Sequence, residues 1–278
     1  MSQIRGKNIL ITGGAAGIGR LMALELAELG GKIILWDINN ANLETTAAEI
    51  SRRGGQVLTY LCDVSSREAV YLTAERVKSD AGIVDILINN AGIVIGKEFL
   101  DYSEAEIEKT IQVDLMANFW TVRAFLPDML TRNEGHLVTI SSAAGTIGVA
   151  KLSVYCVAKF GVFGFHEALR GELHNRGAAI RTTVVCPYYI DTGMFKGVKT
   201  RFSWLLPILK EQKVAHRIVR AIRRNQQRVV MPWMVYTVPL LRLLPVSWFD
   251  ALARFFGINV SMDEFIGRAE SKGGDNGN

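Results

Sequence analysis

The strongest constraint on the fold is an alternation of short apolar runs with longer segments of helical periodicity, which continues over the first two-thirds of the chain. The apolar runs predict strands at Asn8–Thr12, Lys32–Trp36, Gln56–Leu61, Asp85–Asn89, His136–Ile140 and Ile180–Val185. The amphipathic segments between them include Gly17–Leu29, Asn40–Arg53 and Arg67–Asp80. Strands rich in Ile, Leu and Val along their whole length are buried on both faces, which is typical of a parallel sheet covered by helices. With Arg228–Met231 as a candidate last strand, we expect an α/β chain with a Rossmann-type, doubly wound parallel sheet of about seven strands.

Composition excludes several classes of protein. The 278 residues are 49% hydrophobic and 21% charged, which is enough to bury a large core and excludes disorder over most of the length. The three cysteines, Cys62, Cys156 and Cys186, show no CxxC spacing, which favours a reducing, intracellular setting. The four histidines lack metal-ligand spacing, so we expect no metal. No apolar stretch long enough for a signal peptide precedes the first strand, so we expect a cytoplasmic protein.

Positive charge is concentrated in the last third of the chain. The formal net charge is +5, yet residues 196–278 hold 14 Lys and Arg against six Asp and Glu. No nucleic-acid-binding module accompanies this excess, so nucleic acid is not an expected partner. The excess lies beside the apolar run of residues 229–256, which favours either peripheral contact with a membrane surface or a subunit interface. Its uncharged part, Val229–Leu241, is broken by prolines and is shorter than the roughly 20 residues that span a bilayer.

A glycine-rich turn follows the first expected strand and opens the first helix. The expected ligand contacts in it are Gly13, Ala15, Gly17, Ile18 and Gly19. At this place in an α/β sheet, backbone N–H groups and the positive end of the helix hold the pyrophosphate of a dinucleotide, and a Cβ would keep the phosphates away. The G-x3-G-x-G spacing differs from the common G-x-G-x-x-G fingerprint, so by itself the turn also fits a plain strand-to-helix connection.

Two aspartates extend this interpretation. Asp37 follows the second strand about 20 residues beyond the glycines, where a carboxylate accepts hydrogen bonds from the adenosine ribose. The same charge repels a 2′-phosphate and Ala16 supplies no cation, so NAD is favoured over NADP. The alternative for Asp37 is a helix N-cap. Asp63, after the third strand, either hydrogen-bonds the adenine amino group or caps the next helix.

Tyr155 and Lys159 stand four residues apart on an expected helix that runs to about Arg176, which puts the phenol and the ammonium on one face. Ser142 lies just past the expected strand His136–Ile140. With these residues the chain resembles the short-chain dehydrogenase/reductase family, in its single-domain branch. The matching pieces, in the family's order over roughly residues 5–195, are Thr12–Gly19, Asp63, Asn89-Asn90-Ala91-Gly92, Ser142, Tyr155-x-x-x-Lys159 and Pro187…Thr192.

The resemblance implies a role for each matching residue. Tyr155 would be the acid/base in a hydride transfer between nicotinamide and an alcohol or ketone, and Ser142 would orient the substrate oxygen. Lys159 would bind the nicotinamide ribose and favour the phenolate, since an unperturbed tyrosine, with a pKa of about 10, is a poor base at neutral pH. Besides Tyr155, Lys159 and the residues already named, the implied cofactor contacts are Val64, Asn90, Ala91, Gly92, Pro187, Ile190 and Thr192.

Two positions depart from the family pattern. Where the family usually has an Asn that completes a proton relay, this chain has Asp114, a fourth candidate catalytic residue. Asp114 either substitutes through its main-chain carbonyl or changes the relay through its charge, and Asn118, one turn later, is the other candidate. The usual Pro-Gly after the sixth strand is Pro187-Tyr188, which predicts a narrowed, aromatic site entrance.

The segment after Thr192 forms a lid in this family and is apolar here, from Met194 and Phe195 through Phe202 and Trp204 to Leu209. One interpretation is that this segment lines a wide apolar cleft for a small lipophilic substrate such as a retinoid, steroid or long-chain alcohol. The alternative is that it packs on the core or on a partner subunit. The expected substrate contacts are Ser142, Val149, Leu152, Tyr188, Met194 and Phe195. The resemblance is strongest to the retinol/hydroxysteroid branch, at Leu35–Asn39, Phe119–Thr121, Thr192–Phe195 and Met231-Pro232.

The whole chain is thus expected to be one domain. Residues 1–195 would form the dinucleotide-binding and catalytic core, 196–270 the lid, last helix and strand and a C-terminal extension, and 271–278 a disordered tail. The resemblance implies an oxidoreductase of lipid metabolism and a homodimer or homotetramer. The alternative is a nucleotide-sensing or membrane scaffold protein without turnover, against which the intact Ser142, Tyr155 and Lys159 argue.

Overall fold

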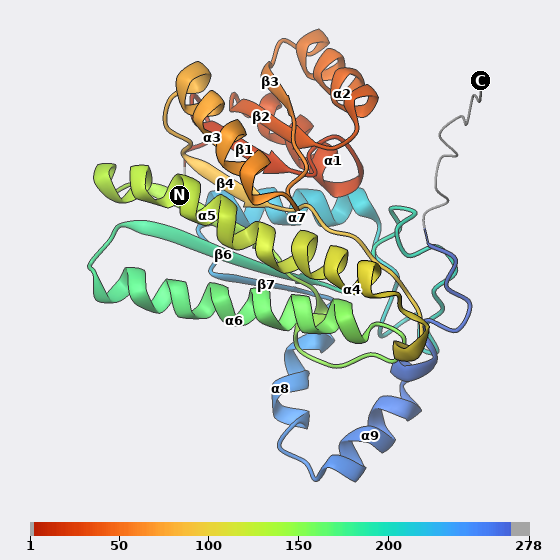
Figure 1. Cartoon of the computed structure of the whole chain (residues 1–278). Coiled ribbons are helices and arrows are strands. Elements are labelled where there is room, and N and C mark those ends of the chain that lie inside the picture. The colour runs from red at the N-terminus through yellow and green to blue at the C-terminus, as the bar shows by residue number, and fades with distance from the viewer. Residues whose placement is uncertain (1–2, 268–278) are drawn as a thin grey trace, which may run out of the picture.

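A sheet of seven parallel strands forms the centre of the computed structural model, which describes residues 3–267 (Figure 1). The strands are β1 (Asn8–Thr12), β2 (Lys32–Asp37), β3 (Gln56–Leu61), β4 (Ile86–Asn89), β5 (Gly135–Ile140), β6 (Ile180–Pro187) and β7 (Arg228–Met231). Their order is β3-β2-β1-β4-β5-β6-β7, and every neighbouring pair is parallel. The strand order reverses between β1 and β4, which is the point where ligands bind to open α/β sheets. The expected Rossmann-type architecture is confirmed.

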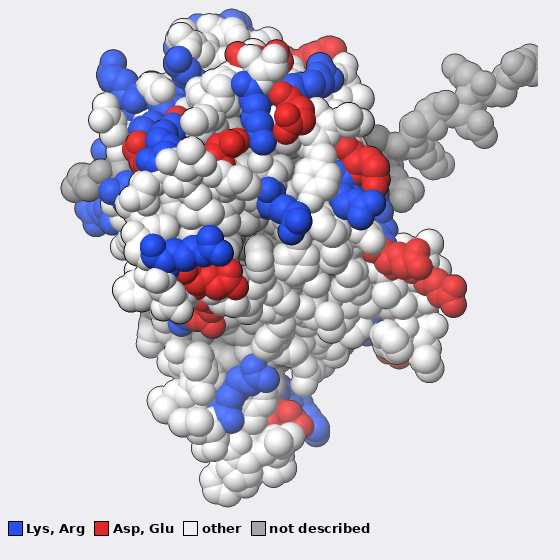
Figure 2. Space-filling view, turned by 60° about the vertical axis from the view of Figure 1, so that its left-hand side comes forward, with Lys and Arg blue, Asp and Glu red and all other residues white. Residues whose placement is uncertain are grey.

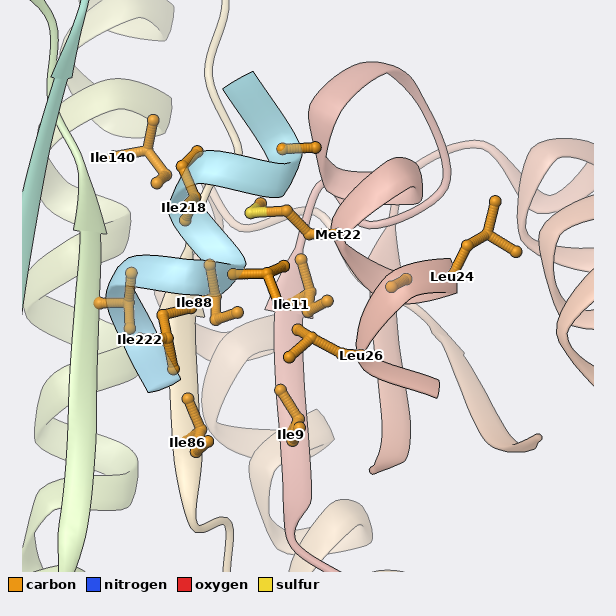
Figure 3. Close-up of a cluster of buried hydrophobic side chains, with 14 of the residues drawn as sticks. Ile9, Ile11, Met22, Leu24, Leu26, Ile86, Ile88, Ile140, Ile218 and Ile222 are labelled. Atoms are coloured by element: carbon orange, nitrogen blue, oxygen red, sulfur yellow. The ribbon is translucent and has the colours of Figure 1, made fainter. Parts of the chain in front are cut away.

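Helices cover both faces of the sheet, and the strands supply apolar side chains to each face in alternation. Ile9 and Ile11 of β1 pack on one face with α1 (Gly17–Glu28), α2 (Asn40–Arg52) and α7 (Glu211–Arg224). Figure 3 shows this cluster, with the two isoleucines facing Met22 and Leu26 of α1. Leu10 packs on the other face with α3 (Arg67–Ala81), α5 (Ala117–Arg132) and α6 (Ser153–Asn175). The sheet is therefore buried on both sides, as its apolar strands require.

A π-helical turn, η2 (Gln112–Met116), joins α4 (Glu104–Ile111) directly to α5, so that one interrupted helix packs on the same face of the sheet as α3 and α6. The start of α4 is fixed by a capping box, in which Ser103 accepts from the Glu106 N–H and the Glu106 side chain accepts from the Ser103 N–H. Single-turn π segments inside α-helices are often found at functional sites. This one carries Asp114.

Asp85 is a buried carboxylate at the opposite, amino edge of the sheet, just before β4. One oxygen accepts the backbone N–H of Asn8, at 2.7 Å, and the other lies 2.8 Å from Arg132 and 3.3 Å from Lys7. Arg132 ends α5 and Lys7 precedes β1. The carboxylate therefore ties two adjacent strands and a helix together, far along the strands from the switch-point edge.

Two short helices, α8 (Val238–Leu241) and α9 (Val246–Phe255), project from the body of the protein after β7 (Figure 1). They follow the 3-10 turn η4 (Trp233–Thr237) and are anchored by Arg242, whose guanidinium donates to the Thr146 carbonyl at 3.1 Å and lies over the Phe160 ring. We refer to residues 233–256 as the C-terminal hairpin.

The apolar run of residues 229–256 is thus not one surface segment. Its first residues, Val229–Met231, are buried in the sheet as β7, and only the C-terminal hairpin exposes apolar side chains. The exposed large apolar residues of this region are Trp233, Tyr236, Leu240, Leu243, Val246, Trp248 and Phe255. Among residues 3–267, no helix has the length and apolar character needed to cross a membrane. The tail expected to be disordered, 271–278, lies outside the described residues.

Candidate active site

A cavity of about 350 Å³ opens at the carboxyl edge of the sheet, at the switch point between β1 and β4. Loops that follow β1, β2, β3, β4, β5 and β6 all contribute to its wall. The predicted site residues that line it are Gly13, Gly17, Ile18, Gly19, Asp37, Asp63, Val64, Asn90, Ala91, Gly92, Ser142, Tyr155, Lys159, Pro187, Tyr188, Ile190, Thr192, Met194 and Phe195. Residues that are far apart in the sequence are thus brought to one site by the parallel topology. Ala15, Asp114, Val149 and Leu152 do not line it.

The glycine turn forms the floor of one end of this cavity. Gly13 has a φ of +60°, and a Cβ at this position would lie 2.9 Å from the Cα of Ala91. A Cβ on Gly19 would overlap the Gly13 carbonyl oxygen. No described side chain caps α1, and its first turn has no acidic residue, so its first N–H groups are left for a ligand. A backbone cradle at a helix N-terminus fits the pyrophosphate of a dinucleotide.

Asp37 is held at the edge of the same cavity by two backbone N–H groups. Its Oδ2 accepts from Ala15 and its Oδ1 from Asn39, both at 3.1 Å. Ala15 is buried, and its N–H positions the Asp37 carboxylate. The N-cap of α2 is Asn39, whose side chain accepts from the Asn42 N–H at 2.9 Å. The alternative in which Asp37 caps this helix therefore does not hold, and its carboxylate faces the cavity.

Asp63 is paired with a residue that the sequence patterns did not indicate. Its Oδ1 accepts from the N–H and hydroxyl of Ser65, at 2.9 and 2.6 Å, and its Oδ2 lies 3.0 Å from the Nζ of Lys109. Partial burial raises the pKa of Asp63, but the bonds from Ser65 and Lys109 outweigh it and lower the pKa. Ser66, not Asp63, is the N-cap of α3. Lys109 lies on α4, and no local motif marks it, because only folding brings it to the cavity.

Three polar side chains meet at the other end of the cavity. Tyr155 and Lys159 lie on one face of α6, are both buried, and the lysine Nζ stands 5.4 Å from the centre of the tyrosine ring. The Nζ also donates to the Ile140 carbonyl, at 3.5 Å. Ser142, just past β5, accepts the Ala144 N–H at 3.1 Å and donates to the Pro187 carbonyl at 3.5 Å. A phenol, a hydroxyl and an ammonium therefore share one partly enclosed wall.

Asp114 lies behind this wall and is fully buried. Its Oδ1 accepts from the Ile93 N–H at 3.1 Å and stands 3.4 Å from the Nζ of Lys159, while its Oδ2 has no partner among the described residues. Burial raises the pKa of the carboxyl, although the charge of Lys159 opposes the rise. The main-chain carbonyl of Asp114 accepts from the Asn118 amide, at 3.1 Å. Its carboxylate is therefore the group that approaches Lys159, and its carbonyl is engaged by Asn118.

The protein's own groups favour the protonated form of Tyr155. Burial raises the pKa of this phenol far above its ordinary value, and the Asp114 carboxylate raises it further, whereas the Ser142 hydroxyl lowers it. The raised pKa keeps the phenol protonated at neutral pH, which is the form that can donate a proton to a developing alkoxide. Removal of that proton needs positive charge close to the ring.

The residues predicted to form the lid separate into several environments. Met194 and Phe195 line the cavity, but Phe202 packs against Phe255 at a centroid distance of 5.5 Å, and Trp204 is exposed. Leu209 is tied to the main chain of Ile190 in a short bridge. The cleft is therefore narrower than a lid made of the whole segment would give.

Val149 and Leu152 lie beyond the main cavity, along a narrow apolar extension of about 30 Å³. This extension also touches Ser142, Tyr155 and Tyr188, so it begins at the polar wall. Within residues 3–267, no cluster of His, Cys, Asp and Glu is arranged to hold a metal ion. The phenol, hydroxyl and ammonium of the polar wall can supply proton transfer and hydrogen bonds to an oxyanion, at the end of the cavity away from the glycine turn.

Comparison with known proteins places this architecture in a defined group. Residues 7–201 match a family model described as short chain dehydrogenase. The chain is 43% identical to short-chain dehydrogenase/reductase family 16C member 6 of Bos taurus, over 96% of this chain and 86% of that protein. It is 43% identical to epidermal retinol dehydrogenase 2 of Homo sapiens, over 95% and 86%. It is 41% identical to estradiol 17-beta-dehydrogenase 11 of Macaca fascicularis, over 95% and 87%.

Solved structures give the same result at the level of the fold. A short chain dehydrogenase/reductase from Burkholderia phymatum, in complex with NAD, superposes with a TM-score of 0.79 at 27% identity, covering 87% of this chain and 95% of that one. A metagenomic short-chain oxidoreductase in complex with NADP superposes with a TM-score of 0.69 at 28% identity, covering 82% and 96%. The two neighbours hold different nucleotides, so fold similarity alone does not choose between them.

Proposed function

The chain belongs to the short-chain dehydrogenase/reductase family, and from this premise we propose that it is an NAD-dependent oxidoreductase that transfers a hydride between nicotinamide and a lipophilic alcohol or ketone. The observation that carries the proposal is the convergence of Ser142, Tyr155 and Lys159 on one wall of a cavity whose other end is a glycine cradle. Retinol and estradiol dehydrogenases among the relatives support a retinoid, a steroid or a long-chain alcohol as the class of substrate.

Three side chains have separate roles in the proposed proton transfer. The bound dinucleotide would supply the hydride acceptor or donor. Ser142 would orient the substrate oxygen through its hydroxyl, whose oxygen is held by the Ala144 N–H. Substrate would take the hydroxyl proton in place of the Pro187 carbonyl, 3.5 Å away. Tyr155 donates the proton to that oxygen in reduction and accepts it in oxidation, and its raised pKa keeps it in the protonated form that reduction needs. Lys159 supplies positive charge beside the ring. Tyr188 and Phe195 restrict the access of water to this wall.

The catalytic assignment is tested by measuring NADH formation with a panel of lipophilic primary and secondary alcohols. Tyr155→Phe should lose activity by several orders of magnitude while still binding NAD, because only the ionisable hydroxyl is removed. Tyr71→Phe, on α3 and away from the cavity, is the matched control and should keep the wild-type rate. Equal rates for Tyr155→Phe and wild type would remove this residue from the mechanism. Tight NAD binding without any turnover would instead favour a nucleotide sensor or scaffold.

The preference for NAD over NADP rests on Asp37. Its two oxygens are fixed by backbone N–H groups and its charge faces the cavity, where a 2′-phosphate would be repelled. Dissociation constants for both nucleotides, measured by calorimetry, should show tighter NAD binding, and Asp37→Ala should reduce the difference at least tenfold. Asp101→Ala, at an exposed position in the 3-10 turn η1 (Phe99–Asp101), is the control. Equal wild-type affinities that Asp37→Ala leaves unchanged would refute the assignment.

We also propose that the C-terminal hairpin contacts a membrane surface. It projects from the body, and Figure 2 shows the projection at the bottom of the molecule as largely uncharged, with a few basic and acidic groups. Such a combination of exposed apolar side chains and nearby Arg is typical of interfacial segments. A lipophilic substrate would also be supplied from such a surface. The alternative for the same surface is an interface between two copies of the chain in a homodimer.

Flotation with anionic phospholipid vesicles tests this contact. A variant that combines Leu243→Ser, Val246→Ser and Trp248→Ser should stay at the bottom of the gradient instead of floating with the vesicles, because it removes three exposed apolar side chains from the hairpin. Leu72→Ser and Leu100→Ser, exposed on other parts of the surface, should float as the wild type does. A triple variant that still floats would refute the proposal. Loss of a dimer in light scattering, without any flotation by the wild type, would assign the surface to a subunit interface.

A further inference from the structure

A second apolar chamber lies beneath the C-terminal hairpin, separate from the catalytic cavity. Its volume is about 80 Å³. Its wall comes from the inner sides of η4, α8 and α9, from Leu205 and Leu206 of the lid segment, and from the turn after β5. Of the residues that line it, only Tyr188 and Thr237 carry a hydroxyl, and none is charged. The Thr237 hydroxyl already donates to the Met234 carbonyl, at 2.7 Å. A chamber of this kind is poor in partners for water and suits an apolar group.

The chamber lies next to the extension that begins at the catalytic wall. The narrow extension that begins at Ser142 and Tyr155 shares Ala143, Ile147, Tyr188 and Ile258 with the chamber. Tyr188 borders all three spaces, the catalytic cavity, the extension and the chamber. The three spaces therefore adjoin one another at Tyr188, and the walls of the extension and the chamber are mostly apolar.

We infer that the extension and the chamber together bind the slender apolar chain of the substrate, whose hydroxyl or carbonyl lies at Ser142 and Tyr155. This inference rests on the proposed function and narrows its substrate class. The extension, at about 30 Å³, is far smaller than the catalytic cavity, so we expect it to favour an unbranched alkyl chain or a single isoprenoid chain over the fused rings of a steroid. The apolar chain of the substrate would break no hydrogen bond in the chamber and would bury its methylenes against leucine, valine and phenylalanine side chains.

The inference predicts a dependence of the rate on chain length, measured with alkan-2-ols from four to ten carbons. In the wild type, kcat/KM should rise about three- to fourfold for each methylene added, the gain expected for burying one such group. Ala253→Leu should abolish the gain for the longer alcohols, because Ala253 is buried on α9 and its side chain faces the chamber. The loss caused by Ala253→Leu should grow with chain length and be smallest for butan-2-ol.

Two further variants separate a filled chamber from a damaged hairpin. Ala251→Leu makes the same change on the same helix at an exposed position and should keep the wild-type dependence on chain length. Val238→Ala, on α8, enlarges the chamber and should move the preferred chain length upward by one or two carbons. Circular dichroism and the melting temperature of each variant show whether the fold is kept.

A binding measurement makes the inference independent of turnover. Decan-2-ol titrated calorimetrically into the protein without nucleotide should bind at least tenfold more weakly to Ala253→Leu than to the wild type and to Ala251→Leu. Absence of turnover with any alcohol, together with this difference, would remove the proposed function and leave the binding site. Equal binding by all three proteins would overturn the inference, as would a kcat/KM that does not depend on chain length or that is highest for a rigid steroid alcohol.

Discussion

Two buried histidines make the stability of this protein sensitive to acid. His136 of β5 shares a hydrogen bond of 2.8 Å with Thr183, and His166 of α6 shares one of 3.1 Å with Thr139. The pKa of His136 is lowered from 6.5 to about 3, chiefly by burial and also by the charges of Arg181 and His166. Burial likewise lowers the pKa of His166 to about 4. Both imidazoles are therefore neutral in the folded protein at any pH above about 5.

The sign and size of the effect follow from proton linkage. Above pH 6.5 both rings are neutral in the folded and the unfolded chain, so they add no pH dependence. Below pH 6.5 the unfolded chain takes up protons that the folded protein excludes, and stability falls until the folded pKa values are reached. Between pH 8 and pH 5, each ring lowers the free energy of unfolding by about 2 kcal/mol, since one pKa unit is worth about 1.4 kcal/mol. Together they remove about 4 kcal/mol, a large share of the 5–15 kcal/mol that is typical of folded proteins.

The assay is urea unfolding at pH 8, 6.5, 5.5 and 5. His136→Gln and His166→Gln should each lose about 2 kcal/mol less than the wild type between pH 8 and pH 5, because glutamine does not titrate. His174→Gln, at an exposed position near the end of α6, is the control and should keep the wild-type dependence. The reasoning is refuted if either buried variant loses the same free energy of unfolding as the wild type over this range.

Three further predictions follow from individual contacts. Gly19→Ala should abolish NAD binding in calorimetry because its Cβ would overlap the glycine turn, whereas Gly148→Ala, whose Cβ meets nothing within 4 Å, should bind normally. Asp114→Asn should move the ascending limb of the pH–rate profile for alcohol oxidation to lower pH, because the carboxylate raises the pKa of Tyr155; an unmoved limb would show that the carboxyl is uncharged. Phe125→Ala should lower the free energy of unfolding by about 3–5 kcal/mol in urea titrations, since this buried ring packs against the Trp36 ring; a loss below about 1 kcal/mol would contradict that packing.

Most of the sheet could be predicted from the sequence because each buried parallel strand is a short run of consecutive apolar residues. Runs such as Ile9–Ile11 are apolar at every position, and the glycines that follow mark where the chain turns into α1. The spacing of Tyr155 and Lys159 on one helix is equally local. The parallel topology then brings the loops after the strands to one edge, so the main part of the candidate site follows from the order of the elements.

The contacts that escaped prediction join residues with no local relation. Lys109 reaches Asp63 from a different element, and Asn118 engages the Asp114 carbonyl through a π-helical turn that no periodicity indicated. The apolar run of residues 229–256 combines the end of the edge strand β7 with the exposed side chains of the C-terminal hairpin, and hydropathy alone does not show where the buried part ends. The place of Leu205 in the wall of the chamber also has no local signal, because the residues that share this wall lie on α8 and α9.

The buried carboxylate of Asp85 lies at the end of the sheet opposite to the chemistry. By joining Lys7, Asn8 and Arg132 it fixes the ends of the strands where no ligand is held. Loops at the carboxyl edge can then accept substitutions, insertions or altered specificity without loosening the scaffold beneath them. Substrate specificity can therefore change, by natural selection or by engineering, without altering the contacts that hold the amino edge of the sheet together.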